Sequence, residues 1–266
     1  MAVISIFSNM EPSSTELKTL FQKKLEAAGF LVFEEFHQDA ELLICVGGDG
    51  ALLNTLRRLS FPDVPVVGVN TGHLGFFQEL QPYELDEFIF RYREKRYEIH
   101  RLKTVGASII MDDDSRGFVV GLNEIVIRGA HSHVTQLNIF IEESFIQTFR
   151  GDGVLVTTPS GSTAYNYTLG GCIVDPRLDV LQLTPIGPVN NSAYRSFPTS
   201  ILLPPDLTLS VYPEYGIKKL ILITADGVEK MYGGVKRIQI GFSDQTVNLI
   251  RFENYDFWNK VKQKLL

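Results

Sequence analysis

The first hundred residues alternate short apolar runs with segments in which apolar side chains recur every three or four positions. Such short runs predict buried β-strands, and the longer spacing predicts amphipathic helices that pack on them. Their alternation indicates an α/β domain with a mostly parallel, Rossmann-like sheet. The predicted strands are residues 3–7, 31–33, 42–46 and 66–69, with helices between them and a last helix near 85–92.

The first predicted helix has a start and a stop signal. Ser14 is the expected N-cap, because a serine hydroxyl can accept a hydrogen bond from a free N–H group of the first turn. Apolar residues then recur at helical spacing until Gly29, a residue type that favours the conformation at helix ends. We expect the apolar face of this helix to lie on the sheet.

From about residue 101 the pattern changes to strands without intervening helices, which predicts an all-β, sandwich-like C-terminal domain. Residues 254–266 regain helical spacing, and we expect this C-terminal helix to dock back on the first domain. The predicted domains are an α/β domain at 1–100, a β-rich domain at 101–252 and the terminal helix at 253–266. The predicted strands of the second domain are 105–110, 118–120, 124–127, 134–141, 154–157, 208–212, 220–224 and 237–240.

The amino-acid composition limits the classes of binding partner and the cellular compartment. The 266 residues are 44% hydrophobic and carry a net charge of −6, which disfavours nucleic acid or an anionic membrane as a partner. The two cysteines, Cys45 and Cys172, cannot form a disulfide framework, and no apolar run reaches the ~18 residues that a membrane span needs. We therefore expect reduced cysteines and a cytoplasmic protein.

The first candidate site is the tetrapeptide Gly47-Gly48-Asp49-Gly50, which follows an apolar run and precedes a helix-forming segment. A strand, a glycine turn and a helix start present backbone N–H groups to an anion. Asp49 would repel a phosphate unless a metal ion or a proton transfer intervenes, so it is predicted to be a base or a metal carboxylate. Alternatively, Asp49 only caps the helix and the glycines only turn the chain.

A second loop, from Asn70 to Phe77, follows the next predicted strand. The carboxyl ends of parallel strands share one edge of a sheet, where ligands of such domains bind, so the two loops should converge. His73 is either a hydrogen-bonded loop residue or a catalytic one. Phe76 is either a stacking platform for a base or part of the core.

The β-rich domain carries further candidates. The amide and carboxylate of Asn123-Glu124 can bind two neighbouring ribose hydroxyls. Arg150 either pairs with Asp152 or reaches a phosphate. The stretch 151–168 combines small residues, hydroxyls and an aromatic ring, which suits close approach of a flat polar ligand.

Several other classes are disfavoured. The chain has no Gly-x-Ser-x-Gly elbow, no Walker A sequence and no Gly-x-Gly-x-x-Gly that opens the first helix. His131 and His133 have the minimal spacing of metal ligands, but no cysteine or carboxylate cluster accompanies them, so a loop is favoured over a metal site.

Taken in order, these stretches resemble the NAD kinase family, part of the fold group that includes diacylglycerol kinases and 6-phosphofructokinases. The resemblance spans nearly the whole chain, and its most specific string is Gly161-Ser162-Thr163-Ala164-Tyr165. The other matching stretches are 47–50, 70–76, 123–124, 151–153, 158–166, 170–171 and 226–227.

The resemblance implies ATP-dependent phosphorylation of the 2′-hydroxyl of the adenosine ribose of NAD, with a divalent cation such as Mg2+ and with no metal-ligating residues assigned. Asp49 would accept the proton, Gly50 would hold phosphates, and Gly187 would reach a neighbour's site in a homo-oligomer, expected to be a tetramer. Residues expected to bind nucleotide are Asp49, Gly50, Asn54, Phe76, Asn123, Glu124, Arg150, Asp152, Thr163, Ala164, Tyr165, Asn166, Thr168, Gly187 and Gly227.

Three positions depart from the resemblance. Ala51 stands where many members have threonine, Asn54 where arginine or histidine is common, and Thr168 where serine is frequent. Asn54 removes a possible cationic contact to phosphate. The open alternatives are a related lipid or sugar kinase and a non-catalytic sensor of NAD, and the phosphoryl donor is either ATP or polyphosphate.

Overall fold

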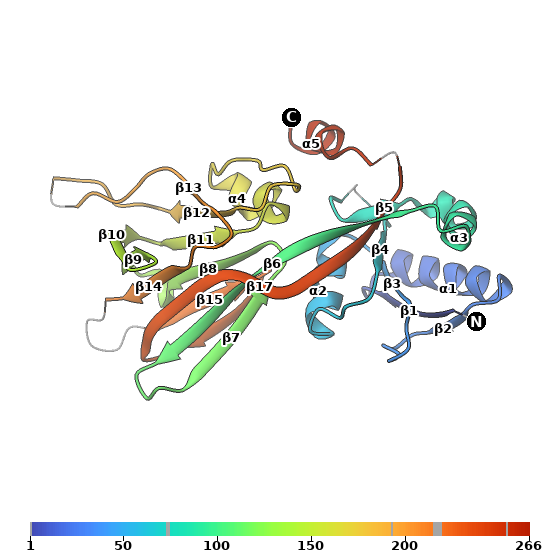
Figure 1. The fold of residues 1–266 in the computed structure, drawn as a ribbon, viewed down its shortest axis with the longest axis horizontal. Coiled ribbons are helices and arrows are strands. Elements are labelled where there is room, and N and C mark those ends of the chain that lie inside the picture. The colour runs from blue at the N-terminus through green and yellow to red at the C-terminus, as the bar shows by residue number, and fades with distance from the viewer. Residues whose placement is uncertain (1, 73–74, 193, 215–219, 254) are drawn as a thin grey trace. The chain divides into compact units, whose positions relative to one another are not determined.

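The computed structural model describes residues 2–72, 75–192, 194–214, 220–253 and 255–266 (Figure 1). The chain forms two compact units. Unit 1 contains residues 1–102 and 245–266, and unit 2 contains residues 103–244. Residues 245–252, which the sequence pattern assigned to the second domain, therefore belong to unit 1.

Unit 1 is the α/β unit. Its strand pairs β1·β2, β1·β3, β3·β4, β4·β5 and β4·β17 are all parallel. The N-terminal elements are β1 (Val3–Ser8), α1 (Pro12–Ala27), β2 (Leu31–Phe33), β3 (Leu42–Val46), α2 (Asp49–Arg58), β4 (Val66–Val69), β5 (Gln78–Leu80), the 3-10 helix η1 (Pro82–Glu84) and α3 (Leu85–Arg93). The C-terminal helix α5 (Phe257–Leu265) completes the unit, as expected.

The core of unit 1 lies where α1 and α3 cover one side of this sheet, while α2 lies on its other side (Figure 1). Phe21 of α1 and Phe88 of α3 meet edge to face at 5.7 Å, and both are fully buried or nearly so. They pack on the inward side chains of the strands, including Ile4, Ile6 and Ile44. Apolar burial of this kind stabilises the sheet edge that carries the glycine turn.

The start of the first helix differs from the prediction. Helix α1 begins at Pro12, with Glu11 as the N-cap residue, so Ser14 lies inside the first turn. Ser14 is fully buried, and its hydroxyl is 2.9 Å from the Thr71 hydroxyl. Proline at the first helical position explains the shift, because its fixed φ and missing N–H suit a helix start.

Unit 2 is built from antiparallel strands in two layers, as expected for a sandwich-like domain. One six-stranded sheet has the order β13-β12-β11-β8-β15-β16, and β10, β9, β14 and β17 pair in the other layer, where β6 pairs with β17 and β7. The elements are β6 (Glu98–Met111), β7 (Arg116–Gly121), β8 (Glu124–Gly129), η2 (Ala130–Ser132), β9 (Thr135–Ile141), β10 (Ser144–Gly151), β11 (Gly153–Thr157), η3 (Ser160–Thr163), α4 (Tyr165–Thr168), β12 (Leu181–Ile186), β13 (Ile201–Leu203), β14 (Leu209–Pro213), β15 (Ile221–Ala225), β16 (Val228–Tyr232) and β17 (Val235–Arg251).

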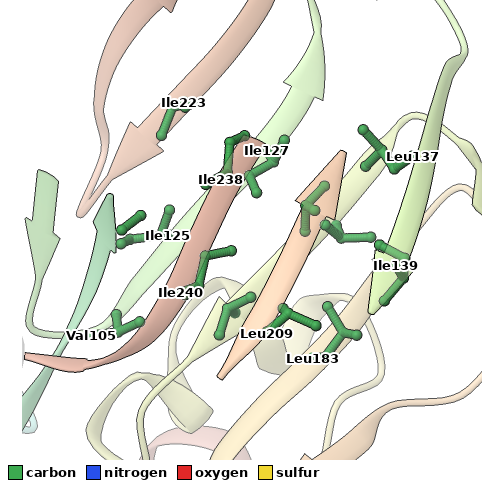
Figure 2. Close-up of a cluster of buried hydrophobic side chains, with 14 of the residues drawn as sticks. Val105, Ile125, Ile127, Leu137, Ile139, Leu183, Leu209, Ile223, Ile238 and Ile240 are labelled. Atoms are coloured by element: carbon green, nitrogen blue, oxygen red, sulfur yellow. The ribbon is translucent and has the colours of Figure 1, made fainter. Parts of the chain in front are cut away.

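The core of unit 2 is aliphatic. Figure 2 shows inward side chains of both layers meeting, among them Ile127 of β8, Ile139 of β9 and Leu183 of β12. All three are fully buried. Such a core holds the strand ends and the loops that follow them in fixed positions.

None of the helices in the described part of the chain is long and apolar enough to cross a membrane.

Candidate active site in two clusters

The first cluster, in unit 1, surrounds Asp49 at the start of α2. Strand β3 ends at Val46, the glycine turn follows, and no side chain caps the helix. Gly47 has a φ of +142°, and a Cβ there would lie 2.7 Å from the Ala51 Cβ, so the turn requires glycine. A Cβ on Gly48 or Gly50 would meet nothing within 4 Å. The turn therefore leaves open space beside the uncapped helix start.

Asp49 is held by backbone donors from the second loop. Its Oδ2 accepts the N–H of Phe76 at 2.9 Å, and its Oδ1 accepts the N–H of Phe77 at 3.0 Å. Gly75 permits this approach, because a Cβ there would lie 2.3 Å from Asp49 Oδ1. The predicted convergence of the two loops is present in unit 1. Asp49 does not act as a helix cap in this arrangement.

The C-terminal segment fixes the loop that holds Asp49. Arg251 donates to the carbonyl oxygens of Phe76 at 2.7 Å and Phe77 at 3.3 Å, and it forms a buried ion pair with Glu79 at 2.9 Å. Lys260 of α5 donates to the Gln78 carbonyl at 2.6 Å. Burial, and secondarily the Arg251 cation, lower the pKa of Lys260 to about 7. Arg251 and Lys260 thus fix the backbone of the loop that supplies the N–H donors to Asp49.

The remaining predicted residues of unit 1 have these surroundings. Phe76 is partly buried, and its ring centroid lies 6.2 Å from that of Phe257 and 4.8 Å from Lys264 Nζ. Asn54 is exposed on α2, and its Oδ1 accepts a hydrogen bond from Arg57 at 2.8 Å. His73 lies outside the described residues.

The second cluster, in unit 2, surrounds Asn123 and Glu124 at the start of β8. The Asp226 carboxylate accepts the backbone N–H groups of Leu122, Asn123 and Glu124 at 2.6, 2.8 and 3.2 Å. Asp226 and Gly227 form the turn between β15 and β16 with φ values of +44° and +79°. An Asp-Gly pair suits a hairpin turn in which both central residues have positive φ. This turn therefore positions the Asn123-Glu124 pair.

Asn123 and Glu124 keep unused hydrogen-bonding capacity. They are 7% and 8% exposed, and within the described residues neither Asn123 Oδ1 nor Glu124 Oε2 has a hydrogen-bond partner. Burial, together with the nearby Asp226 charge, raises the pKa of Glu124 to about 8. At neutral pH its carboxyl group is mostly protonated and can both donate and accept. Buried groups without partners are costly, so this cluster suits a polar ligand.

The hydroxyl-rich loop lies against this pair. Thr158 Oγ1 donates to the Leu122 carbonyl at 2.6 Å, and Thr157 Oγ1 donates to the Asn123 carbonyl at 2.9 Å. A Cβ on Gly161 would lie 2.2 Å from the Asn123 carbonyl oxygen, so only glycine permits this packing. Unit 2 thus brings together the loop and the Asn123-Glu124 pair.

The predicted residues of this loop differ in their accessibility. Thr163, Ala164 and Tyr165 are partly buried, whereas Thr168 is exposed and donates to the Tyr165 carbonyl at 2.8 Å. The Tyr165 hydroxyl accepts a hydrogen bond from Arg128 at 2.5 Å. Asn166 is fully buried, and its amide binds Thr184, Ser162 and Cys172. These contacts favour an indirect role for Asn166, which shapes the loop.

Arg150 and Asp152 have separate surroundings. The Arg150 guanidinium stacks on the Tyr194 ring at 3.5 Å, a cation–π contact. Asp152 is exposed and lies against Gly187, where a Cβ would be 2.6 Å from Asp152 Oδ2. Gly187 has a φ of +53°, which favours glycine.

Sequence reasoning missed several residues that complete these clusters. Gln78 is 1% exposed beside Gly75, and Lys264 Nζ lies 4.0 Å from Asp49 Oδ2. Tyr194 and Arg128 contact two predicted residues in unit 2. A basic residue at helical spacing on the C-terminal helix was the one available signal for Lys264, and it could not indicate which partner Lys264 contacts.

No group of three or more His, Cys, Asp and Glu side chains within the described residues could hold a metal ion. The protein side chains around Asp49 therefore do not fit a dedicated metal cage. A Mg2+ ion commonly binds through one or two carboxylates together with substrate phosphates.

An uncapped helix start beside a fixed carboxylate suits an anionic ligand in unit 1, and the buried polar groups of unit 2 suit a polar one, so the two units have the features of a nucleotide-binding protein. Two family models match the chain: the ATP-NAD kinase N-terminal domain over residues 8–97 and the ATP-NAD kinase C-terminal domain over residues 122–252. The chain belongs to the NAD kinase family.

Individual relatives agree with this assignment. The chain is 34% identical to the NAD kinase of Finegoldia magna over 99% of this chain and 98% of the relative. It is 36% identical to NAD kinase 2 of Halalkalibacterium halodurans over 86% of this chain and 85% of the relative.

Two solved structures share the fold. Yeast NADH kinase in complex with NADH aligns with a TM-score of 0.85 at 20% identity, covering all of this chain and 87% of that chain. An NAD kinase from Archaeoglobus fulgidus in complex with ATP aligns with a TM-score of 0.77 at 23% identity, covering 98% of both.

Proposed function

We propose that the chain is an NAD kinase, which transfers a phosphoryl group from ATP to the 2′-hydroxyl of the adenosine ribose of NAD and releases NADP. The observation that carries this proposal is Asp49, whose two oxygens are fixed by backbone N–H groups beside open space at an uncapped helix start. The substrates in this proposal are inferred from family membership, and the site of the reaction is inferred from the geometry around Asp49.

Asp49 is the proton acceptor in this proposal. The 2′-oxygen forms a bond to the γ-phosphorus, the bond from that phosphorus to the bridging oxygen of ATP breaks, and the electron pair leaves with ADP. The hydroxyl proton passes to Asp49. Phosphoryl transfer depends mainly on positioning and on electrostatic stabilisation, so the rigid support of Asp49 matters more than its strength as a base.

The second cluster recognises the dinucleotide in this proposal. Asn123 and Glu124 supply buried hydrogen-bonding atoms for ribose hydroxyls, and Tyr165 supplies a ring next to the small Ala164. The reaction requires both functions, because the acceptor must be oriented while its hydroxyl is deprotonated.

A divalent cation, Mg2+ by default, accompanies the donor phosphates in this proposal and neutralises their charge. The described side chains offer no cluster that would hold it independently of the donor.

We also propose a homotetramer, as the family resemblance implies, and a cytoplasmic location. The unpaired cysteines Cys45 and Cys172 support a reducing compartment. Light scattering after gel filtration tests the oligomeric state directly.

The deciding experiment measures NADP formation from NAD and Mg2+ with either ATP or polyphosphate, detected by an NADP-specific dehydrogenase. We expect product with ATP, and the second donor tests whether a polyphosphate replaces it. Measurable NAD binding without product from either donor would overturn the kinase assignment and favour a sensor. Phosphorylation of lipid vesicles in place of NAD would favour a lipid kinase.

A further inference from the structure

The last helix brings a lysine to the catalytic carboxylate without forming a close ion pair. Lys264 Nζ lies 4.0 Å from Asp49 Oδ2, and the two side chains are 26% and 28% exposed. Elsewhere in unit 1, Lys18–Glu34 and Lys24–Asp86 close to 2.6 and 2.7 Å. A lysine that served only to pair with Asp49 would be expected to close in the same way.

The described groups around Asp49 have different partners from Lys264. Both Asp49 oxygens accept a backbone N–H group, which leaves a second lone pair on each oxygen. The second lysine of α5, Lys260, donates to the Gln78 carbonyl and faces the supporting loop. Lys264 instead keeps its ammonium over the Phe76 ring, at 4.8 Å from the centroid. Within the described residues the Lys264 ammonium has no partner at hydrogen-bond distance, so its donors are available to a ligand beside Asp49.

A buried side chain independently points to a polar ligand at the same place. Gln78 is 1% exposed, and within the described residues neither its Oε1 nor its Nε2 has a hydrogen-bond partner. A Cβ on Gly75 would lie 1.6 Å from Gln78 Oε1 and 2.3 Å from Asp49 Oδ1, so the amide and the carboxylate flank one point. A buried amide without partners costs free energy that a bound polar ligand would offset.

We propose that Lys264 binds the phosphate chain of the phosphoryl donor, at the phosphoryl group that is transferred. This proposal rests on the proposed kinase function, and it names the cation that the neutral Asn54 does not supply. Lys264 and the open glycine turn both adjoin Asp49, and a Cβ on Gly48 or Gly50 would meet nothing within 4 Å. A phosphate there would contact the lysine, and the uncapped start of α2 would face its negative charge.

In the reaction, Lys264 contributes an electrostatic contact and takes part in no bond change. It opposes the negative charge on the transferred phosphoryl oxygens while Asp49 takes the proton of the acceptor hydroxyl, so the two groups act on opposite partners of one step. The ammonium also reduces repulsion between Asp49 and the phosphate, because a cation beside two anions lowers the cost of bringing them together.

The test compares Lys264→Met and Lys264→Arg with Lys262→Met, an exposed lysine two residues earlier on the same helix. The first readout is calorimetric binding of inorganic tripolyphosphate without NAD. Because a charge-assisted contact to the phosphate is lost, Lys264→Met should weaken binding by about 10-fold or more. Lys264→Arg should retain much of the affinity, and Lys262→Met should bind as the unmodified chain does.

The second readout is steady-state kinetics with ATP and, separately, with polyphosphate. Lys264→Met should raise the KM for each donor that the native chain uses while the KM for NAD stays within about 2-fold, because the lost contact is to the phosphate chain. Unchanged tripolyphosphate binding in Lys264→Met, with only kcat lowered, would overturn the proposal and leave Lys264 as a structural partner of Asp49. So would a native chain that does not bind tripolyphosphate.

The outcomes separate this proposal from the proposed function. Lysine-dependent binding of tripolyphosphate in a chain that makes no NADP would support the phosphate site and refute the kinase assignment. Normal NADP formation and normal tripolyphosphate binding in Lys264→Met would support the kinase assignment and refute the phosphate site at Lys264.

Discussion

The two clusters position their polar groups by opposite means. In unit 1, both oxygens of Asp49 are satisfied by backbone donors, and the loop that supplies those donors is fixed by Arg251 and Lys260. In unit 2, the backbone around Asn123 and Glu124 is fixed by Asp226, but the side-chain atoms Asn123 Oδ1 and Glu124 Oε2 have no partner within the described residues.

This difference matches what each cluster has to do. A group that takes a proton needs a fixed position before the substrate arrives, because reorientation during the reaction would raise the barrier. A group that recognises a ligand needs free hydrogen-bonding capacity. Its specificity arises because a wrong ligand leaves the buried polar groups of the site without hydrogen-bond partners. Loss of Asp49 in unit 1 should therefore appear in kcat, and damage to the Asn123-Glu124 pair in unit 2 should appear in the KM for NAD.

The largest effect on turnover is expected from Asp49→Asn. The amide cannot take up the proton of the acceptor hydroxyl, so kcat should fall by ~100-fold or more, the range for loss of a positioned base. Dinucleotide affinity should stay within a few-fold, because that cluster is untouched. Steady-state rates and calorimetric NAD binding check the two halves of the prediction.

The substitution also disturbs its own support, which requires a control. The new side-chain amide would present its NH2 group to a backbone N–H of Phe76 or Phe77, which costs about 1–3 kcal/mol for an unpaired donor. Thermal unfolding of the variant shows whether the fold survives at the assay temperature. Turnover close to that of the native chain in a folded variant would refute the assignment of Asp49 as base.

An intermediate effect is expected from Gly161→Ala. The new Cβ would lie 2.2 Å from the Asn123 carbonyl oxygen, a backbone atom that cannot move without displacing the recognition pair. Overpacking of this kind costs about 1–3 kcal/mol of folding stability. Displacement of the recognition pair should also weaken its contacts with NAD, so the KM for NAD should rise by about 10-fold while kcat at saturating NAD changes less.

Gly241→Ala is the matched control for that variant. Gly241 lies in the unit 2 part of β17, and a Cβ there would meet nothing within 4 Å. Its KM for NAD should equal that of the native chain. An equal rise in KM for both glycine variants would show that the effect does not come from the contact with Asn123.

Much of the fold could be predicted from the sequence, because strands such as β3 and β4 are uninterrupted apolar runs that are buried along their whole length. Strand β12 was missed because Gln182, Thr184 and Pro185 interrupt its pattern. Gln182 and Thr184 are nevertheless buried, because hydrogen bonds within the fold satisfy their polar atoms. Gln182 accepts the Cys172 N–H, and Thr184 donates to Asn166. Tertiary hydrogen bonds of this kind leave no periodic signal in the sequence.

In the candidate site, too, some residues could be predicted from the sequence and others could not. Asp49 was predictable because its strand, glycine turn and helix are consecutive in the chain. The residues that support its loop, Arg251 and Lys260, lie about two hundred residues later, and their proximity depends on the pairing of Leu249 in β17 with Val66 in β4. Asp226 was part of a recognised motif, but its role as acceptor for the Leu122–Glu124 backbone required the structure.

The smallest effect on turnover at neutral pH is expected from Glu124→Gln, because glutamine resembles the protonated carboxyl group that is present below a pKa of about 8. The variant should differ from the native chain mainly in the pH dependence of its stability.

Between the ordinary pKa of glutamate, near 4.5, and about 8, the folded state holds a proton on Glu124 that the unfolded state has released. The native free energy of unfolding should therefore fall as pH rises through this window and level off above pH 8, and Glu124→Gln should lack that contribution. Urea unfolding at pH 5, 7 and 9 measures it, with Glu143→Gln, an exposed position next to β10, as the matched control. If native and Glu124→Gln proteins lose stability in parallel across this range, burial does not raise the pKa of Glu124, and the prediction is wrong.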